Sequence, residues 1–117
     1  MDLVEVIVRV VVTDLPTSTL WYQRLLDLEP VEPDDGTSVF VLTPGTTLQL
    51  VERAEITSAE PGCSLSLRVQ DLGGAVAHVD GLGLPRSEVA TLGETAGAFT
   101  LVDPDGREVT ILQVARA

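Results

Sequence analysis

Four charged side chains have the greatest potential for chemistry, because they stand in stretches that alternate polar and apolar residues: Glu5, Arg9, Arg68 and Glu108. A carboxylate can act as a general base, and an arginine can hold an anionic oxygen. The alternative is that these four pair with one another or lie at a rim, because buried charges are usually paired. His78, the only histidine, falls in a predicted helix without a charged partner to position it, so we do not expect it to be a base or a ligand.

The composition limits the partners that the chain can have. It contains 117 residues, of which 44% are hydrophobic, and this is enough for one globular domain with its own core. The formal net charge is −11 and there is no lysine, which argues against nucleic acid and permits attraction of cationic ligands. No apolar run approaches the roughly 20 residues that span a bilayer, and the N-terminus lacks the basic region of a signal peptide. We therefore expect no membrane partner, a cytoplasmic location and, from the lysine-free composition, a bacterial source.

The first half of the chain predicts a strand, a helix and three short strands. Residues 3–12 alternate, with valine at every even position from Val4 to Val12. Asp14 is placed to cap a helix that has Pro16 in its first turn and continues to about Leu28. Strands are expected near residues 29–32, 38–42 and 46–53, with a turn at 33–36 and a polar connector at 54–62.

The first predicted helix carries an apolar stripe at helical spacing. Trp21, Leu25 and Leu28 form this stripe, and Leu20 lies beside it. One interpretation of Trp21 and Tyr22 is ligand stacking. A stripe at this spacing usually faces the core, so we favour packing of the helix on a sheet.

The second half repeats the order of the first. Residues 63–69 alternate as a strand that begins at Cys63, whose solitary thiol offers neither a disulfide framework nor a metal cluster. Asp71 is placed to cap a second helix that ends near Val79, and a strand follows near residues 87–92. The corner Val12-Thr13-Asp14-Leu15 reappears as Val69-Gln70-Asp71-Leu72, which indicates an internal repeat.

The most specific local signal is the segment Asp103-Pro104-Asp105-Gly106 between two apolar runs. Asp103 can accept hydrogen bonds from the backbone of the turn, Pro104 presets its own φ, and Gly106 tolerates the geometry at the exit. We therefore expect residues 99–112 to form a β-hairpin.

Taken together, these motifs resemble the vicinal oxygen chelate superfamily, the group of glyoxalases, bleomycin-resistance proteins and extradiol dioxygenases. The matching residues are the corner at 12–15, Ser18, Trp21-Tyr22, Leu25-Leu26, Leu48-Gln49-Leu50 and the turn at 103–106. Asp27 departs from the glycine that the family usually has at the helix exit, although aspartate can adopt the left-handed conformation at modest cost. The resemblance implies an α+β fold in which two βαβββ modules form a curved mixed sheet with helices on its outer face. It also implies one domain over residues 1–117, with modules at about 1–54 and 62–117, and a homodimer.

In metal-dependent members of that family, four positions supply a His or Gln, a Glu, a His and a Glu to one divalent metal. Carried over by the spacing of the motifs, the residues here are Ile7, Gln49, Ser64 and Thr110. A stable site needs at least three imidazole, carboxylate or thiolate ligands, and these four residues provide none. We therefore expect no metal and no cofactor. A register error of two residues would bring in Glu5 or Glu108 but would not restore four ligands.

The same resemblance, combined with strand alternation, predicts which side chains line a ligand cavity. They form a polar lining that carries both signs of charge: Glu5, Ile7, Arg9, Thr47, Gln49, Ser64, Ser66, Arg68, Glu108 and Thr110.

Three functions are compatible with this lining. The first is a small-molecule-binding protein that sequesters or senses its ligand in the manner of bleomycin-resistance proteins; the scarcity of aromatic residues counts against a close match. The second is a metal-independent lyase or isomerase with Glu5 or Glu108 as base and Arg9 or Arg68 as anion-holding group. The third is a structural module with a closed face. A glyoxalase-type or dioxygenase-type metalloenzyme is the least favoured alternative. We rank the small-molecule-binding protein first.

Overall fold

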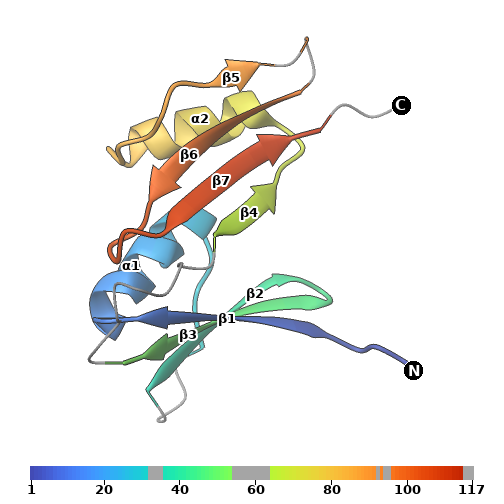
Figure 1. The fold of residues 1–117 in the computed structure, drawn as a ribbon, viewed down its shortest axis with the longest axis vertical. Helices are drawn as coiled ribbons and strands as arrows, with labels where there is room; N and C mark the ends of the chain where they lie inside the picture. The colour runs from blue at the N-terminus through green and yellow to red at the C-terminus, as the bar shows by residue number, and fades with distance from the viewer. Residues whose placement is uncertain (32–35, 54–63, 92, 94–95, 115–117) are drawn as a thin grey trace. The chain divides into compact units, whose positions relative to one another are not determined.

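The computed structural model describes residues 1–31, 36–53, 64–91, 93 and 96–114, and these residues form two helices and seven strands (Figure 1). The chain divides into two compact units, Met1–Pro61 and Gly62–Ala117. The order of elements is β1 (Val6–Val12), α1 (Leu15–Leu26), β2 (Thr37–Thr43), β3 (Thr46–Glu52), β4 (Leu65–Arg68), α2 (Leu72–Gly81), β5 (Ala90–Thr91), β6 (Gly97–Val102) and β7 (Glu108–Gln113). The predicted α+β fold class is confirmed. Among the described residues, neither helix combines the length and apolarity that crossing a membrane requires.

Unit 1 contains a three-stranded mixed sheet in the order β1-β3-β2. β1 runs parallel to β3, with Arg9 opposite Gln49, and β2 runs antiparallel to β3, with Val39 opposite Gln49. The strand predicted near residues 29–32 is reduced to a single bridge between Val31 and Val39. Residues 33–35 of the predicted turn at 33–36 lie outside the described residues. Its last residue, Gly36, has φ 76°.

The corner between β1 and α1 forms as predicted. Asp14 has extended backbone angles, and its Oδ1 accepts a hydrogen bond from the N–H of Thr17 at 3.2 Å. The N–H of Leu15 donates to Oε2 of Glu52, the last residue of β3, at 2.7 Å. α1 ends at Asp27, which adopts the left-handed conformation with φ 54°. The side chain of Asp27 therefore replaces the usual glycine without preventing the helix from ending there.

The buried stripe of α1 differs from the predicted one. The helix buries Tyr22 and Leu25 together with the hydroxyl residues Ser18 and Thr19, whereas Leu20 is 48% exposed. Positions 18, 22 and 25 are spaced i, i+4 and i+7, so they share one face of the helix, and this face packs on the sheet. Trp21 is half-buried and contacts Tyr22 edge to face, with ring centroids 4.8 Å apart. The favoured interpretation, packing rather than ligand stacking, holds for Tyr22, which is fully buried.

The core of unit 1 lies between α1 and one face of its sheet. That face is formed by alternate residues of the three strands, all nearly inaccessible to solvent: Val10, Val12, Ser38, Phe40, Leu48 and Leu50. The hydroxyls of Thr19 and Ser38 satisfy each other across this layer at 2.8 Å. The predicted valine face of β1 is buried only at its C-terminal end, because Val4 and Val6 are exposed and β1 begins at Val6.

Unit 2 contains a four-stranded mixed sheet in the order β4-β7-β6-β5, and α2 covers one of its faces (Figure 1). Asp71 caps α2 by accepting a hydrogen bond from the N–H of Gly74 at 3.1 Å. The N–H of Leu72 donates to Oε1 of Gln113, the last residue of β7, at 2.7 Å. The strand predicted at 87–92 shortens to Ala90–Thr91, and both Cys63 and the connector at 54–62 lie outside the described residues.

The predicted hairpin at residues 99–112 is confirmed by the antiparallel pairing of β6 and β7. Oδ1 of Asp103 accepts hydrogen bonds from the N–H groups of Asp105 and Arg107 at 3.0 and 2.8 Å. Oδ2 of Asp103 forms an ion pair with Nη1 of Arg107 at 2.7 Å, in which the Asp103 side chain is fully buried. Gly106 has φ 84°, a conformation that favours glycine. One buried carboxylate therefore organises the whole turn.

Candidate functional site

The predicted lining residues lie on or beside the strands of both units, on the faces that the helices leave uncovered. In unit 1, β1 and β3 carry four of them, and Glu5 directly precedes β1: Ile7, Arg9, Thr47 and Gln49. In unit 2, β4 and β7 carry four more, and Ser64 directly precedes β4: Ser66, Arg68, Glu108 and Thr110. Successive side chains of a strand point to opposite faces, and the buried residues of these strands, apart from Thr47, occupy the other positions. That the two sets line one cavity stays a prediction.

In unit 1, Arg9 and Gln49 form the centre of the uncovered face. They are opposite each other in the parallel pair of β1 and β3. Nε of Arg9 donates a hydrogen bond to Oε1 of Gln49 at 3.0 Å. Arg9 is exposed and Gln49 is half-buried. The guanidinium is thus hydrogen-bonded to a neutral side chain and not to a carboxylate.

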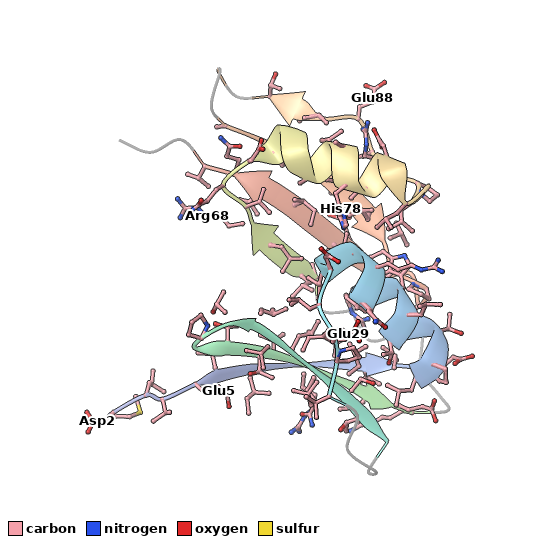
Figure 2. All side chains as sticks on the ribbon, turned by 180° about the vertical axis from the view of Figure 1, so that it is seen from behind. Asp2, Glu5, Glu29, Arg68, His78 and Glu88 are labelled. Atoms are coloured by element: carbon pink, nitrogen blue, oxygen red, sulfur yellow. The ribbon has the colours of Figure 1, made fainter. Side chains whose placement is uncertain are left out.

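Glu5 and Thr47 form a second contact on this face. The hydroxyl of Thr47 donates to Oε2 of Glu5 at 2.6 Å, and Thr47 is itself almost fully buried. Figure 2 shows Glu5 at the N-terminal end of β1. Thr47 and Gln49 are two residues apart on β3, so the two contacts are separated by about 7 Å along the strand. A carboxylate and a guanidinium therefore stand on one face, each bound to an uncharged neighbour.

In unit 2, the uncovered face carries a row of hydroxyl groups across three strands. Thr110 of β7 is opposite Ser66 of β4 on one side and opposite Thr100 of β6 on the other. Thr100 was missed in the sequence prediction. The register of the hairpin could have identified it, because a turn at 103–106 places residue 100 opposite residue 110.

The two charged residues of this face stand apart within unit 2. Arg68 is at the C-terminal end of β4, opposite Leu112, and Figure 2 shows its side chain at the margin of this unit. Glu108 begins β7, opposite Val102. Among the described residues of each unit, no ion pair joins Glu5 to Arg9 or Arg68 to Glu108, so the alternative that these charges pair with one another is not seen within either unit.

Other titratable groups lie away from these faces. His78 is exposed in the last turn of α2. Arg86 donates from Nε and Nη2 to the two carboxylate oxygens of Asp80 at 2.8 and 3.0 Å, and these hydrogen bonds lower the pKa of Asp80 and raise that of Arg86. Arg86 also lies 5.9 Å above the ring of the buried Phe99. This contact anchors the segment after α2 to β6 and is structural.

Over the part of the chain that the structure describes, no three His, Cys, Asp or Glu side chains gather as a metal site would require. The described geometry instead offers hydrogen-bonding groups with both donor and acceptor character. On the unit 1 face these are a guanidinium, a carboxylate and an amide, and on the unit 2 face they are a row of hydroxyls with Arg68 and Glu108 at strand ends. Such groups can orient a polar small molecule.

No protein-family model matches the chain, and no match was found among curated proteins. Solved structures do match. A glyoxalase / bleomycin resistance protein from Catenulispora acidiphila DSM 44928 is 26% identical with a TM-score of 0.81, over 96% of this chain and 99% of that one. A glyoxylase/bleomycin resistance protein/dioxygenase domain from Frankia sp. EAN1pec is 22% identical with a TM-score of 0.73, over 95% and 90%. A lactoylglutathione lyase from Agrobacterium tumefaciens is 16% identical with a TM-score of 0.72, over 92% and 90%. The resemblance predicted from the sequence motifs is therefore confirmed, and the chain has the fold of these proteins.

Proposed function

We propose that this chain with the vicinal oxygen chelate fold is a small-molecule-binding protein that works without a metal. In this proposal it sequesters or senses its ligand on the uncovered faces of its sheets, as a cytoplasmic homodimer. The observation that supports it is the bond between Arg9 and Gln49. Gln49 is the one family ligand position with an amide oxygen, and that oxygen already accepts an N–H from a cation.

The donor set does not fit a divalent metal. The other three family positions hold Ile7, Ser64 and Thr110, which offer a hydrocarbon and two neutral hydroxyls. Zn, Ni, Fe and Mn sites in proteins are built from imidazole, carboxylate and thiolate groups. A guanidinium at hydrogen-bonding distance from Gln49 opposes a second cation at the same place. We therefore assign no chemical step to a metal.

A second candidate function is a metal-independent lyase or isomerase. It is favoured by one observation, namely that Glu5 and Arg9 share the unit 1 face without pairing with each other. Glu5 would serve as the general base and Arg9 would hold the developing oxyanion. Turnover of a bound ligand that is lost in Glu5→Gln, with binding retained, would favour this alternative.

The primary test combines metal analysis with thermal unfolding. We expect the purified protein to contain no stoichiometric metal, and we expect Ni, Zn, Mn and Fe(II) to leave its melting temperature unchanged. A panel of small molecules that includes metal-free bleomycin should contain at least one that stabilises the protein in proportion to its concentration. Stoichiometric metal, or stabilisation by the metals alone, would contradict the proposal.

A matched control is a variant with the ligand set of the family restored. It combines four changes: Ile7→His, Gln49→Glu, Ser64→His and Thr110→Glu. If the four positions are mapped correctly, this variant should gain concentration-dependent stabilisation by Zn or Ni that the natural chain lacks. A folded variant that binds no metal would show that these four residues do not form the ligand set that the resemblance implies.

A further inference from the structure

The uncovered face of unit 1 contains a cation that belongs to the protein itself, the guanidinium of Arg9. We propose that the Arg9 guanidinium performs the recognition that a metal ion performs elsewhere in this fold, and that the ligand carries a carboxylate and an apolar body. The inference rests on the proposed function and names its ligand class. Its starting observation is that Nε of Arg9 donates to Oε1 of Gln49 at 3.0 Å.

The hydrogen bond to Gln49 leaves the two terminal nitrogens of the Arg9 guanidinium available for a ligand. A guanidinium has five N–H groups, and the Nε bond to Gln49 uses one of them. Arg9 is exposed, and no further hydrogen bond of its side chain occurs among the described residues. With Nε bound to Gln49, the two terminal nitrogens are available as the planar fork that binds a carboxylate through two parallel hydrogen bonds.

The surroundings of this fork are aliphatic. On β1, Ile7 and Val11 flank Arg9 on the same face, and Ile7 is 55% exposed. Across the sheet, Val39 lies opposite Gln49, and Val51 lies opposite Val11. A carboxylate bound at Arg9 would therefore place its carbon chain over apolar side chains, which favours a ligand with an apolar body over a small polar acid.

Glu5 restricts the charge that such a ligand can carry. Its carboxylate bonds to Thr47, about 7 Å along β3 from the Arg9 contact. A second negative charge on the ligand would meet this carboxylate, so monocarboxylates should bind better than dicarboxylates of the same length. In unit 2, the residue opposite Thr110 is Ser66, so no guanidinium stands at the corresponding place.

The experiment uses three probes that share one hydrocarbon chain, namely hexanoate, hexanol and hexylammonium. Each is titrated into the full chain, and backbone amide chemical shifts are followed at Ile7, Arg9 and Gln49. We expect hexanoate to bind about tenfold more tightly than hexylammonium, as charge-assisted hydrogen bonds in a partly exposed site predict. Adipate should bind more weakly than hexanoate.

The variant Arg9→Gln removes the fork, and Arg9→Lys keeps the charge without the fork. Arg24→Gln, in α1, changes the net charge equally at an exposed position and serves as the control. We expect Arg9→Gln to abolish the preference for hexanoate, Arg9→Lys to retain only part of it, and Arg24→Gln to keep it. Amide spectra report in the same experiment whether each variant is folded.

The outcomes separate this inference from the proposed function. Equal binding of hexanoate by the natural chain and by Arg9→Gln, or a preference for hexylammonium, would overturn the role of Arg9. The small-molecule proposal would still stand. A panel ligand that binds while hexanoate does not would also overturn it and leave the small-molecule proposal standing. Absence of binding by every probe and every panel member would overturn both.

Discussion

Replacing Glu52 tests the long-range bond that fixes the first helix to its sheet. Oε2 of Glu52 accepts the N–H of Leu15 at 2.7 Å, and in unit 2 the amide oxygen of Gln113 accepts the N–H of Leu72 at the same distance. Both acceptors are the last residue of the strand that pairs parallel with the strand before the helix. The unit 2 bond shows that a neutral oxygen is sufficient, so Glu52→Gln should preserve the joint and Glu52→Ala should break it.

The size of each effect follows from the two contributions of Glu52. A hydrogen bond to a charged group contributes about 1.5–3 kcal/mol when it is shielded, and the exposure of this one reduces that to about 1 kcal/mol. A negative charge at a helix N-terminus adds about 0.3–1 kcal/mol. Glu52→Ala should therefore destabilise the protein by about 1–2 kcal/mol, and Glu52→Gln by about 0.5 kcal/mol. Gln113→Ala should lose about 1 kcal/mol, whereas Gln113→Glu should be neutral or stabilising.

The assay is urea unfolding followed by the fluorescence of Trp21, the only tryptophan, with far-ultraviolet circular dichroism as a second probe. Trp21 lies in α1, so its signal reports directly on the helix that Glu52 holds. The midpoint is compared at constant slope, since a changed slope indicates a different unfolding process. Equal destabilisation by Glu52→Gln and Glu52→Ala would show that charge, not the oxygen acceptor, is essential, and the proposed equivalence with Gln113 would be wrong.

Three further predictions concern unit 2. Asp103→Ala should destabilise the protein by about 3–5 kcal/mol, because the change leaves Arg107 without its buried counterion and removes the acceptor of two backbone N–H groups. Urea unfolding measures this loss, and a value below about 1 kcal/mol would contradict the role given to Asp103 in the turn. Gly97→Ala should cost about 1–3 kcal/mol, because an added Cβ would lie 2.9 Å from both the carbonyl oxygen of Ala90 and Cδ2 of Leu72; Gly45→Ala, with open space around the new methyl, is the control in the same unfolding assay. The pKa of Asp80 lies below its ordinary value of 3.8 through hydrogen bonds from Arg86, so its contribution to stability is present above that value and is lost as the pH falls through the lower folded pKa. Asp80→Asn should remove this acid-dependent part, and identical pH profiles of stability for the variant and the natural chain would refute the assignment.

Local side-chain chemistry made much of the fold predictable. Asp14 and Asp71 cap their helices by accepting an N–H three residues ahead, and Asp103 organises a turn within four residues. Such interactions depend only on neighbouring residues, so a short motif predicts them. The left-handed conformation of Asp27 was also consistent with its residue type.

The sequence predictions were wrong where contacts between residues distant in the sequence determine the structure. Trp21, Leu25 and Leu28 have the spacing of one helical stripe, but the helix packs Tyr22 and not Trp21 on the sheet of unit 1. No local preference distinguishes Tyr22 from the adjacent Trp21. The described residues of the strands predicted at 29–32 and 87–92 form shorter pairings than expected, because a strand needs a paired partner and alternation alone does not supply one. The candidate lining residues were placed on the uncovered faces by alternation, whereas the bond between Arg9 and Gln49 depends on the parallel register of strands that are 40 residues apart.

The two units share the hydrogen bonds that join each helix to its sheet, and they differ in the residues of the uncovered face. The helix caps and the strand-end acceptors have equivalents in both units, and each acceptor bonds at 2.7 Å. At the equivalent place on the uncovered face, unit 1 has Arg9 opposite Gln49 and unit 2 has Ser66 opposite Thr110. Because the hydrogen bonds that fix each helix to its sheet do not involve these pairs, the face residues can change without loss of the fold. At this place unit 1 has a cation and unit 2 has neutral hydroxyls, while the charges of unit 2, Arg68 and Glu108, stand at strand ends. If the proposed function is correct, we expect Arg9 of unit 1 to decide the head group of the ligand.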